Sequence, residues 1–249
     1  MSQLKFHDKI FTFCFTTIIF ATLLKINPTI AASSTKKNFG ERRVSVDSDL
    51  RVQYHERTAA LTEWDDENTL IGCELVSISD NSTFNKLTGL IIDEPKPITF
   101  DEMNELISHC DNIDLPLKKK KNTIFSKQTL NIVSGIFPGT KWCGSSNLAK
   151  SYHDLGLRSE LDRCCRAHDF CPVKIRGKET RFNITNTSQF TKLHCKCDDI
   201  FYNCLKSVEG PAANLVGRTY FNFSKRDCFE QNTNSTNNNY EFREPKKEF

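Results

Sequence analysis

The stretch Asp162-Arg163-Cys164-Cys165-Arg166-Ala167-His168-Asp169-Phe170-Cys171 decides the fold of this chain. Three cysteines lie within these ten residues, together with His168 and Asp169. Cys164, His168 and Cys171 recur at helical spacing, so the stretch predicts a helix that carries all three on one face. Such a helix would present an imidazole with a carboxylate directly beside it.

A second cluster, Cys195-Lys196-Cys197-Asp198-Asp199-Ile200-Phe201-Tyr202-Asn203-Cys204, has a matching rhythm. Cys197 and Cys204 are seven residues apart, as Cys164 and Cys171 are. This spacing is about two helical turns, or roughly 10.5 Å of rise. The connection between the clusters is short, which favours antiparallel helices joined by Cys171–Cys197 and Cys164–Cys204. In that register His168 lies within a turn of Asp198, so a second carboxylate faces the imidazole.

The start of the 249-residue chain predicts a signal peptide over residues 1–32. Lys5 and Lys9 precede an apolar run from Ile10 to Leu24, and Ala31 and Ala32 offer a cleavage site. A signal anchor is the alternative, but the run is shorter than the ~20 residues of a membrane span. We therefore expect a secreted, extracellular protein.

Cysteine usage agrees with export. Cys14 would leave with the signal peptide, and ten cysteines would remain, an even number in an oxidising compartment. Asn-x-Ser/Thr sequons, which suit a secreted glycoprotein, begin at Asn81, Asn183, Asn186, Asn222 and Asn234.

Residues 33–121 form an N-terminal propeptide or accessory region in this interpretation, with a small α+β fold. The expected elements are helices at Val52–Leu61 and Phe100–Ile107 and strands at Leu70–Ile78 and Leu90–Ile92. Cys73 and Cys110 are the only cysteines of this region, so we pair them with each other. His55 and His109 are isolated, and no catalytic constellation is evident.

The run Lys118–Lys121 ends the N-terminal region and precedes a linker at residues 122–135. A run of like charges is typical of a solvated linker, and this run is also a plausible processing site that would release the following domain. That domain, residues 136–230, carries eight cysteines. Residues 231–249 read as a polar C-terminal tail, disordered at least over Gln231–Asn239, which is nearly all Asn, Thr and Ser.

The loop Phe137-Pro138-Gly139-Thr140-Lys141-Trp142-Cys143-Gly144-Ser145-Ser146-Asn147 is the third chemical stretch. It holds no carboxylate and can offer backbone carbonyls and amides. Ca²⁺ binds backbone oxygens together with carboxylates, and Asp169 could supply the carboxylate. Cys165 lies one turn before Asp169 and is the natural disulfide partner of Cys143.

These three stretches together resemble the group III secreted phospholipases A2, the bee-venom type, from about Ile136 to Cys228. The resemblance implies a mainly α, disulfide-rich fold: two antiparallel disulfide-linked helices with a calcium loop and a small β-wing. It also implies Cys143–Cys165, Cys164–Cys204, Cys171–Cys197 and Cys195–Cys228. Residues before about 130 lie outside it.

The resemblance further implies calcium-dependent hydrolysis of the sn-2 acyl ester of glycerophospholipids to lysophospholipid and free fatty acid. His168 would be the general base for water, and Asp198 would orient it, with Tyr220 in support. Asp169 and the carbonyls of Trp142, Gly144 and Ser146 would bind Ca²⁺. The Gly144 amide would help to stabilise the oxyanion.

One position departs from the family pattern. The family loop reads Trp-Cys-Gly-x-Gly, and the second glycine is Ser146 here. If this position requires a positive φ, serine carries backbone strain of about 1 kcal/mol or more. The alternative function is therefore a non-catalytic phospholipase-like binding protein with a weakened calcium loop. Zinc and a purely structural His168 are disfavoured, because secreted thiols oxidise and because Asp169 and Asp198 flank the imidazole.

The expected partner is a phospholipid membrane surface, bound peripherally. Residues 136–249 hold 18 Lys and Arg against 13 Asp and Glu, a net charge of +5, which favours anionic interfaces. Ile136 and Phe137 are the apolar residues expected to touch lipid. The motifs indicate no nucleic-acid partner, and the oligomeric state is not determined by the sequence.

Overall fold

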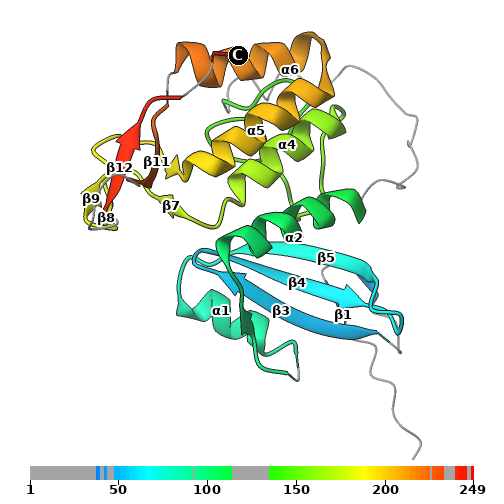
Figure 1. The fold of residues 1–249 in the computed structure, drawn as a ribbon. Coiled ribbons are helices and arrows are strands. Elements are labelled where there is room, and N and C mark those ends of the chain that lie inside the picture. The colour runs from blue at the N-terminus through cyan, green and yellow to red at the C-terminus, as the bar shows by residue number, and fades with distance from the viewer. Residues whose placement is uncertain are drawn as a thin grey trace, which may run out of the picture. The chain divides into compact units, whose positions relative to one another are not determined.

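The computed structural model describes residues 38–39, 42–43, 48–91, 93–113, 135–224, 226–232, 239–245 and 248–249 (Figure 1). The elements before residue 114 are β1 (Asn38–Phe39), β2 (Arg42–Arg43), β3 (Asp49–His55), β4 (Thr58–Trp64), β5 (Leu70–Ser77), α1 (Asn81–Thr88), β6 (Lys96–Pro97) and α2 (Phe100–Ile113). The helices after residue 134 are α4 (Ser159–Asp169), α5 (Cys195–Val208), α6 (Gly210–Gly217) and the π-helix η1 (Arg218–Phe223). The strands there are β7 (Lys174–Ile175), β8 (Thr180–Arg181), β9 (Ile184–Thr185), β10 (Lys192–Leu193), β11 (Cys228–Gln231) and β12 (Tyr240–Arg243).

The N-terminal region is a four-stranded sheet in the order β5-β4-β3-β6. The helix expected at Val52–Leu61 is wrong, because these residues form most of the β3–β4 hairpin. His55 pairs with Thr58, so the turn is the two residues between them, and Glu56 takes a positive φ of 49° there. β4 is a central strand buried on both faces, and such a strand reads as an apolar run that a buried helix could equally produce.

The other N-terminal expectations have mixed outcomes. The strand at Leu70–Ile78 is confirmed as β5, and the helix at Phe100–Ile107 is confirmed as the longer α2. Thr99 and Glu102 form a capping box at the start of α2, with Thr99 N donating to Glu102 Oε2 at 2.7 Å and Glu102 N donating to Thr99 Oγ1 at 3.2 Å. A strand at Leu90–Ile92 is wrong for Leu90 and Ile91, which follow α1 in a turn, and Ile92 lies outside the described residues.

Helices α4 and α5 form the centre of the C-terminal half and lie side by side (Figure 1). Disulfides Cys164–Cys204 and Cys171–Cys197 join them in an antiparallel register. Cys143–Cys165 and Cys195–Cys228 hold the loop before α4 and strand β11 to this pair, and Cys73–Cys110 joins β5 to α2. These five bonds connect the cysteines that the sequence analysis paired. The disulfide-rich class, with helices and small sheets, is confirmed.

The described C-terminal residues belong to the fold, which corrects the expectation of a polar tail from residue 231. Strand β12 pairs antiparallel with β11, and Gln231 of the expected tail is part of β11. The Phe249 ring lies 5.2 Å from the ring of Tyr202. Because Tyr240 and Phe242 alternate with charged residues, the segment has a strand pattern that its Asn-rich neighbours obscured. Residues 233–238 lie outside the described residues.

The Asn186 sequon is buried. Asn186 is 0% exposed, and its Nδ2 donates to the carbonyls of Ile175, Arg176 and Phe190 at 2.7 to 3.2 Å. An amide nitrogen committed to these bonds has no room for a glycan. Asn81 and Asn183 are exposed, whereas Asn222 uses its side chain to bond the Phe249 backbone. Asn234 lies outside the described residues.

None of the helices in the described part of the chain is both long and apolar enough to span a bilayer.

Candidate active site

His168 and Asp198 meet between α4 and α5. His168 Nε2 lies 2.8 Å from Asp198 Oδ1, and the Tyr220 hydroxyl donates to the same oxygen at 3.1 Å. Both side chains of the first pair are less than a tenth exposed. Because a carboxylate only accepts, Nε2 carries the proton and Nδ1 keeps a lone pair. The arrangement leaves Nδ1 as the basic nitrogen of the ring.

Aromatic rings hold this imidazole in place. The Phe201 ring stacks on it at 4.2 Å between centroids, and the Tyr220 ring meets it edge-on at 5.1 Å. Phe201 follows Asp198 by three residues, so α5 presents both side chains to His168. Burial and the neighbouring Asp198 hold the pKa of Tyr220 well above its usual range, which keeps the hydroxyl protonated as a donor.

The loop that holds Trp142, Gly144 and Ser146 is anchored by a buried carboxylate. Asp162 of α4 is 0% exposed and accepts the backbone N–H groups of Lys141, Trp142 and Gly156 at 2.7 to 2.9 Å. The Cys143–Cys165 disulfide adds a covalent link one turn before Asp169. Asp162 was not among the site residues predicted from the sequence, although its place one turn before Cys165 and Arg166 put it on the same helix as the predicted site.

The Asp169 carboxyl has the surroundings of a cation ligand. Burial raises the pKa of this carboxyl to about 7, although the attraction of the Lys174 cation lowers it. Among the described residues, no hydrogen bond or salt bridge engages the Asp169 carboxylate; Lys174 Nζ donates instead to the Asp169 carbonyl at 2.8 Å. A partly buried carboxylate that lacks a donor fits a hard cation such as Ca²⁺.

The loop that holds Trp142, Gly144 and Ser146 can offer a metal ion backbone carbonyl oxygens but no carboxylate. In the described ranges, no three His, Cys, Asp or Glu side chains are grouped to hold a metal ion, so a calcium site here depends on backbone carbonyls beside one carboxylate. The Trp142 ring packs 5.8 Å from the ring of Phe170, next to Asp169. Gly144 and Ser146 are exposed. The loop thus lies against the end of α4 that carries His168 and Asp169.

Two details of the loop bear on the sequence expectations. Ser146 does not have a positive φ, so the backbone strain considered for this position is absent. Gly144 N–H donates to the Trp142 carbonyl at 3.1 Å, so the amide expected at the oxyanion is paired within the loop. Gly144 itself is required by packing, since a Cβ there would lie 2.3 Å from the Gly135 carbonyl oxygen.

Comparison with known proteins finds relatives for the C-terminal part of the chain. The phospholipase A2 family model matches residues 136–232. The chain is 44% identical over 95 residues to "Phospholipase A2" of Bombus pensylvanicus, covering 38% of this chain and 70% of that protein. It is 45% identical over 94 residues to the "Phospholipase A2" of Xylocopa appendiculata circumvolans and 47% identical over 95 residues to that of Hottentotta tamulus.

These matches cover 52% of the Xylocopa protein and 56% of the Hottentotta protein, so the chain spans about half the length of these relatives. They cover 38% and 36% of this chain. The disulfide-linked helix pair with its buried His168–Asp198 couple agrees with the arrangement that the resemblance to phospholipases A2 implied. The chain belongs to the phospholipase A2 family, as the resemblance to its group III members indicated.

Proposed function

We propose that this protein is a calcium-dependent phospholipase A2 that hydrolyses the sn-2 acyl ester of glycerophospholipids. The observation that carries the proposal is the contact of 2.8 Å between His168 Nε2 and Asp198 Oδ1, within a chain of the phospholipase A2 family. The products are lysophospholipid and free fatty acid.

His168 acts as the general base on water. Its Nδ1 lone pair accepts a proton from a water molecule as the oxygen attacks the ester carbonyl carbon. Asp198 holds the ring orientation through Nε2 and stabilises the imidazolium that forms. Tyr220 fixes the Asp198 carboxylate by its hydrogen bond of 3.1 Å. The same imidazolium then protonates the departing alkoxide.

Asp169 and the carbonyls of Trp142, Gly144 and Ser146 would hold Ca²⁺. The ion, when bound, supplies positive charge to the ester carbonyl oxygen and the substrate phosphate. The Gly144 amide serves the oxyanion once its bond to the Trp142 carbonyl opens, which is a local change at one turn of the loop. The alternative, a non-catalytic binding protein, loses its main support because Ser146 carries no positive φ.

Calcium should stabilise the protein as well as activate it. Extracellular calcium sites bind with a Kd of about 10⁻⁴ to 10⁻³ M. At a Kd of about 1 mM, about 10 mM Ca²⁺ adds about 1.4 kcal/mol, which raises Tm by about 3–6 °C over the protein in chelator. Asp169→Asn should abolish both this shift and turnover in a vesicle assay. Asp199→Asn is the matched control, because Asp199 is exposed and should leave both unchanged. Full turnover in excess chelator contradicts the calcium assignment.

Export and peripheral membrane binding belong to the same proposal. The predicted signal peptide, residues 1–32, lies outside the described residues.

Ile136 is 2% exposed, which corrects its expected contact with lipid. The exposed apolar side chains beside the loop are Leu157, 81% exposed, and Leu148, 43% exposed. Leu148 N donates to the Lys141 carbonyl. Arg158, the residue after Leu157, donates its N–H to the Gly139 carbonyl, so both leucines border the loop.

Leu157→Glu should weaken binding to phosphatidylglycerol vesicles. Burial of a leucine side chain contributes about 1.5–3 kcal/mol, so its loss and the added negative charge should raise Kd at least about tenfold. Vesicle sedimentation measures the change. Leu90→Glu is the control with the same charge change at an exposed leucine of the N-terminal region. An equal loss in both variants means a general charge effect, and an unchanged Leu157→Glu refutes the contact.

A further inference from the structure

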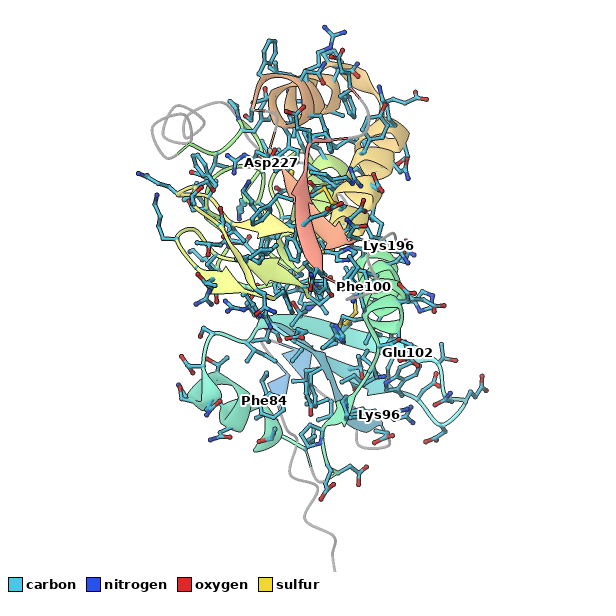
Figure 2. The ribbon with its side chains drawn as sticks, turned by 60° about the vertical axis from the view of Figure 1, so that its left-hand side comes forward. Phe84, Lys96, Phe100, Glu102, Lys196 and Asp227 are labelled. Atoms are coloured by element: carbon cyan, nitrogen blue, oxygen red, sulfur yellow. A yellow bond between two sulfur atoms is a disulfide. The ribbon has the colours of Figure 1, made fainter. Side chains whose placement is uncertain are left out.

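Helix α2 of the N-terminal region packs on α4 and α5, the helices that carry His168 and Asp198, as part of one core. Met103 and Ile107 of α2 are buried in the same cluster as Trp142, Leu161 and Phe170 of the phospholipase A2 domain. The Phe100 ring lies 4.6 Å from the ring of His194, and Figure 2 shows Phe100 beside Lys196 at the start of α5. The two regions therefore share apolar surface that each would expose alone.

A buried charge links the regions at the middle of this contact. Arg166, in the stretch that carries His168, has a fully buried side chain. Its guanidinium donates to Asp111 Oδ1 of α2 at 2.7 Å and to the Tyr152 carbonyl at 2.7 Å. It also lies 3.9 Å from the centre of the Tyr152 ring. A negative charge that faces this buried cation therefore comes from the N-terminal region.

Polar contacts continue on both sides of α2. Thr58 Oγ1 donates to the Phe170 carbonyl at 3.0 Å, and Arg57 N donates to the Pro172 carbonyl at 3.2 Å. Arg57 forms a salt bridge with Glu179, and Lys196 Nζ lies 2.5 Å from Asp101 Oδ1. The β3–β4 hairpin thus contacts the segment that follows His168, and helix α2 contacts the start of α5.

The regions also share a cavity of about 350 Å³ that reaches His168. Asn104, Ile107 and Ser108 of α2 line one side of it. His168, Ile200 and Phe201 are among the residues of α4 and α5 that line the other side. Ser108 is exposed, which places it where the cavity opens to solvent.

We propose that the N-terminal region is a permanent part of the enzyme. It stays bound after any cleavage at Lys118–Lys121, because Asp111 neutralises buried Arg166, and α2 supplies a wall of the substrate cavity beside His168. The run Lys118–Lys121 lies outside the described residues. No disulfide among the described cysteines crosses from one region to the other, so this binding is noncovalent. Only the cavity role rests on the proposed function.

Cleavage of the full chain at an engineered protease site in place of Lys118–Lys121 tests whether the N-terminal region stays bound. Native gel filtration should show both fragments in one peak. Asp111→Asn should raise the dissociation constant of the cut fragments at least about tenfold, because it removes a carboxylate charge that pairs with the buried Arg166 cation. Asp101→Asn removes the Lys196–Asp101 salt bridge, whose side chains are 50% and 73% exposed, and should change the dissociation constant less than about twofold. Separate elution of the wild-type fragments, or equal effects of the two variants, overturns the proposal without reference to catalysis.

Ser108→Trp tests the cavity wall. The indole should fill the shared cavity and lower kcat/KM on phospholipid vesicles by about tenfold, while the cut fragments still co-elute. His109→Trp adds the same side chain at the neighbouring exposed position, which does not line the cavity, and should leave kcat/KM unchanged. Equal kcat/KM values for the two variants overturn the cavity role. An inactive wild-type enzyme would instead refute the proposed function, and retention would still be decided by co-elution.

Discussion

His168→Gln should lower kcat by roughly 10³-fold or more while the protein stays folded, because general-base catalysis contributes about 10²–10⁴-fold. Glutamine keeps an N–H that can donate to Asp198 and removes the basic nitrogen. The imidazole packs between Phe201 and Tyr220, so near-ultraviolet circular dichroism and the urea midpoint report whether that packing survives. The rate on phospholipid vesicles at saturating calcium is the measurement.

His109→Gln is the matched control for this variant. His109 is exposed on α2 and is not among the residues assigned to the reaction, so its replacement should leave kcat within about twofold. Turnover near the wild-type rate in folded His168→Gln protein would remove His168 as the base. A loss of both activity and near-ultraviolet signal would instead assign His168 a structural role.

Asp162→Ala should cost about 3–5 kcal/mol of stability, because it removes the acceptor of three backbone N–H groups that belong to Lys141, Trp142 and Gly156. Each buried donor left without a partner costs about 1–3 kcal/mol. The urea midpoint should fall by about 2 M. Calcium affinity should fall as well, since the loop would lose the carboxylate that fixes its backbone.

Glu160→Gln is the control for Asp162. Glu160 is exposed in the same first turn of α4, and a surface change of this kind stays within about 0.5 kcal/mol. Asp162→Asn should lie between the two, because it keeps one acceptor oxygen. An Asp162→Ala protein with an unchanged urea midpoint and calcium titration would show that Asp162 does not hold the loop.

The helix pair could be predicted because its information is local. Cys164, His168 and Cys171 repeat at helical spacing, and Cys197 and Cys204 repeat the same interval, so one antiparallel register satisfies both disulfides. The same register brought Asp198 to His168. The hairpin at Val52–Leu61 could not be predicted in this way, because its short apolar run suits a buried strand and a buried helix alike.

The sequence by itself therefore determined the helix pair, its two disulfides and the residues on it that could do chemistry, since periodic spacing along one element decides which side chains share a face, whereas Cys195–Cys228 came from the resemblance to the family. Only the tertiary structure decided that Asp162 holds the loop, that Asn186 is buried, and that Asp111 faces Arg166. Each of these depends on residues from separate segments meeting in a low-dielectric interior, where an unpaired polar group is costly. No local pattern records which distant group will satisfy it.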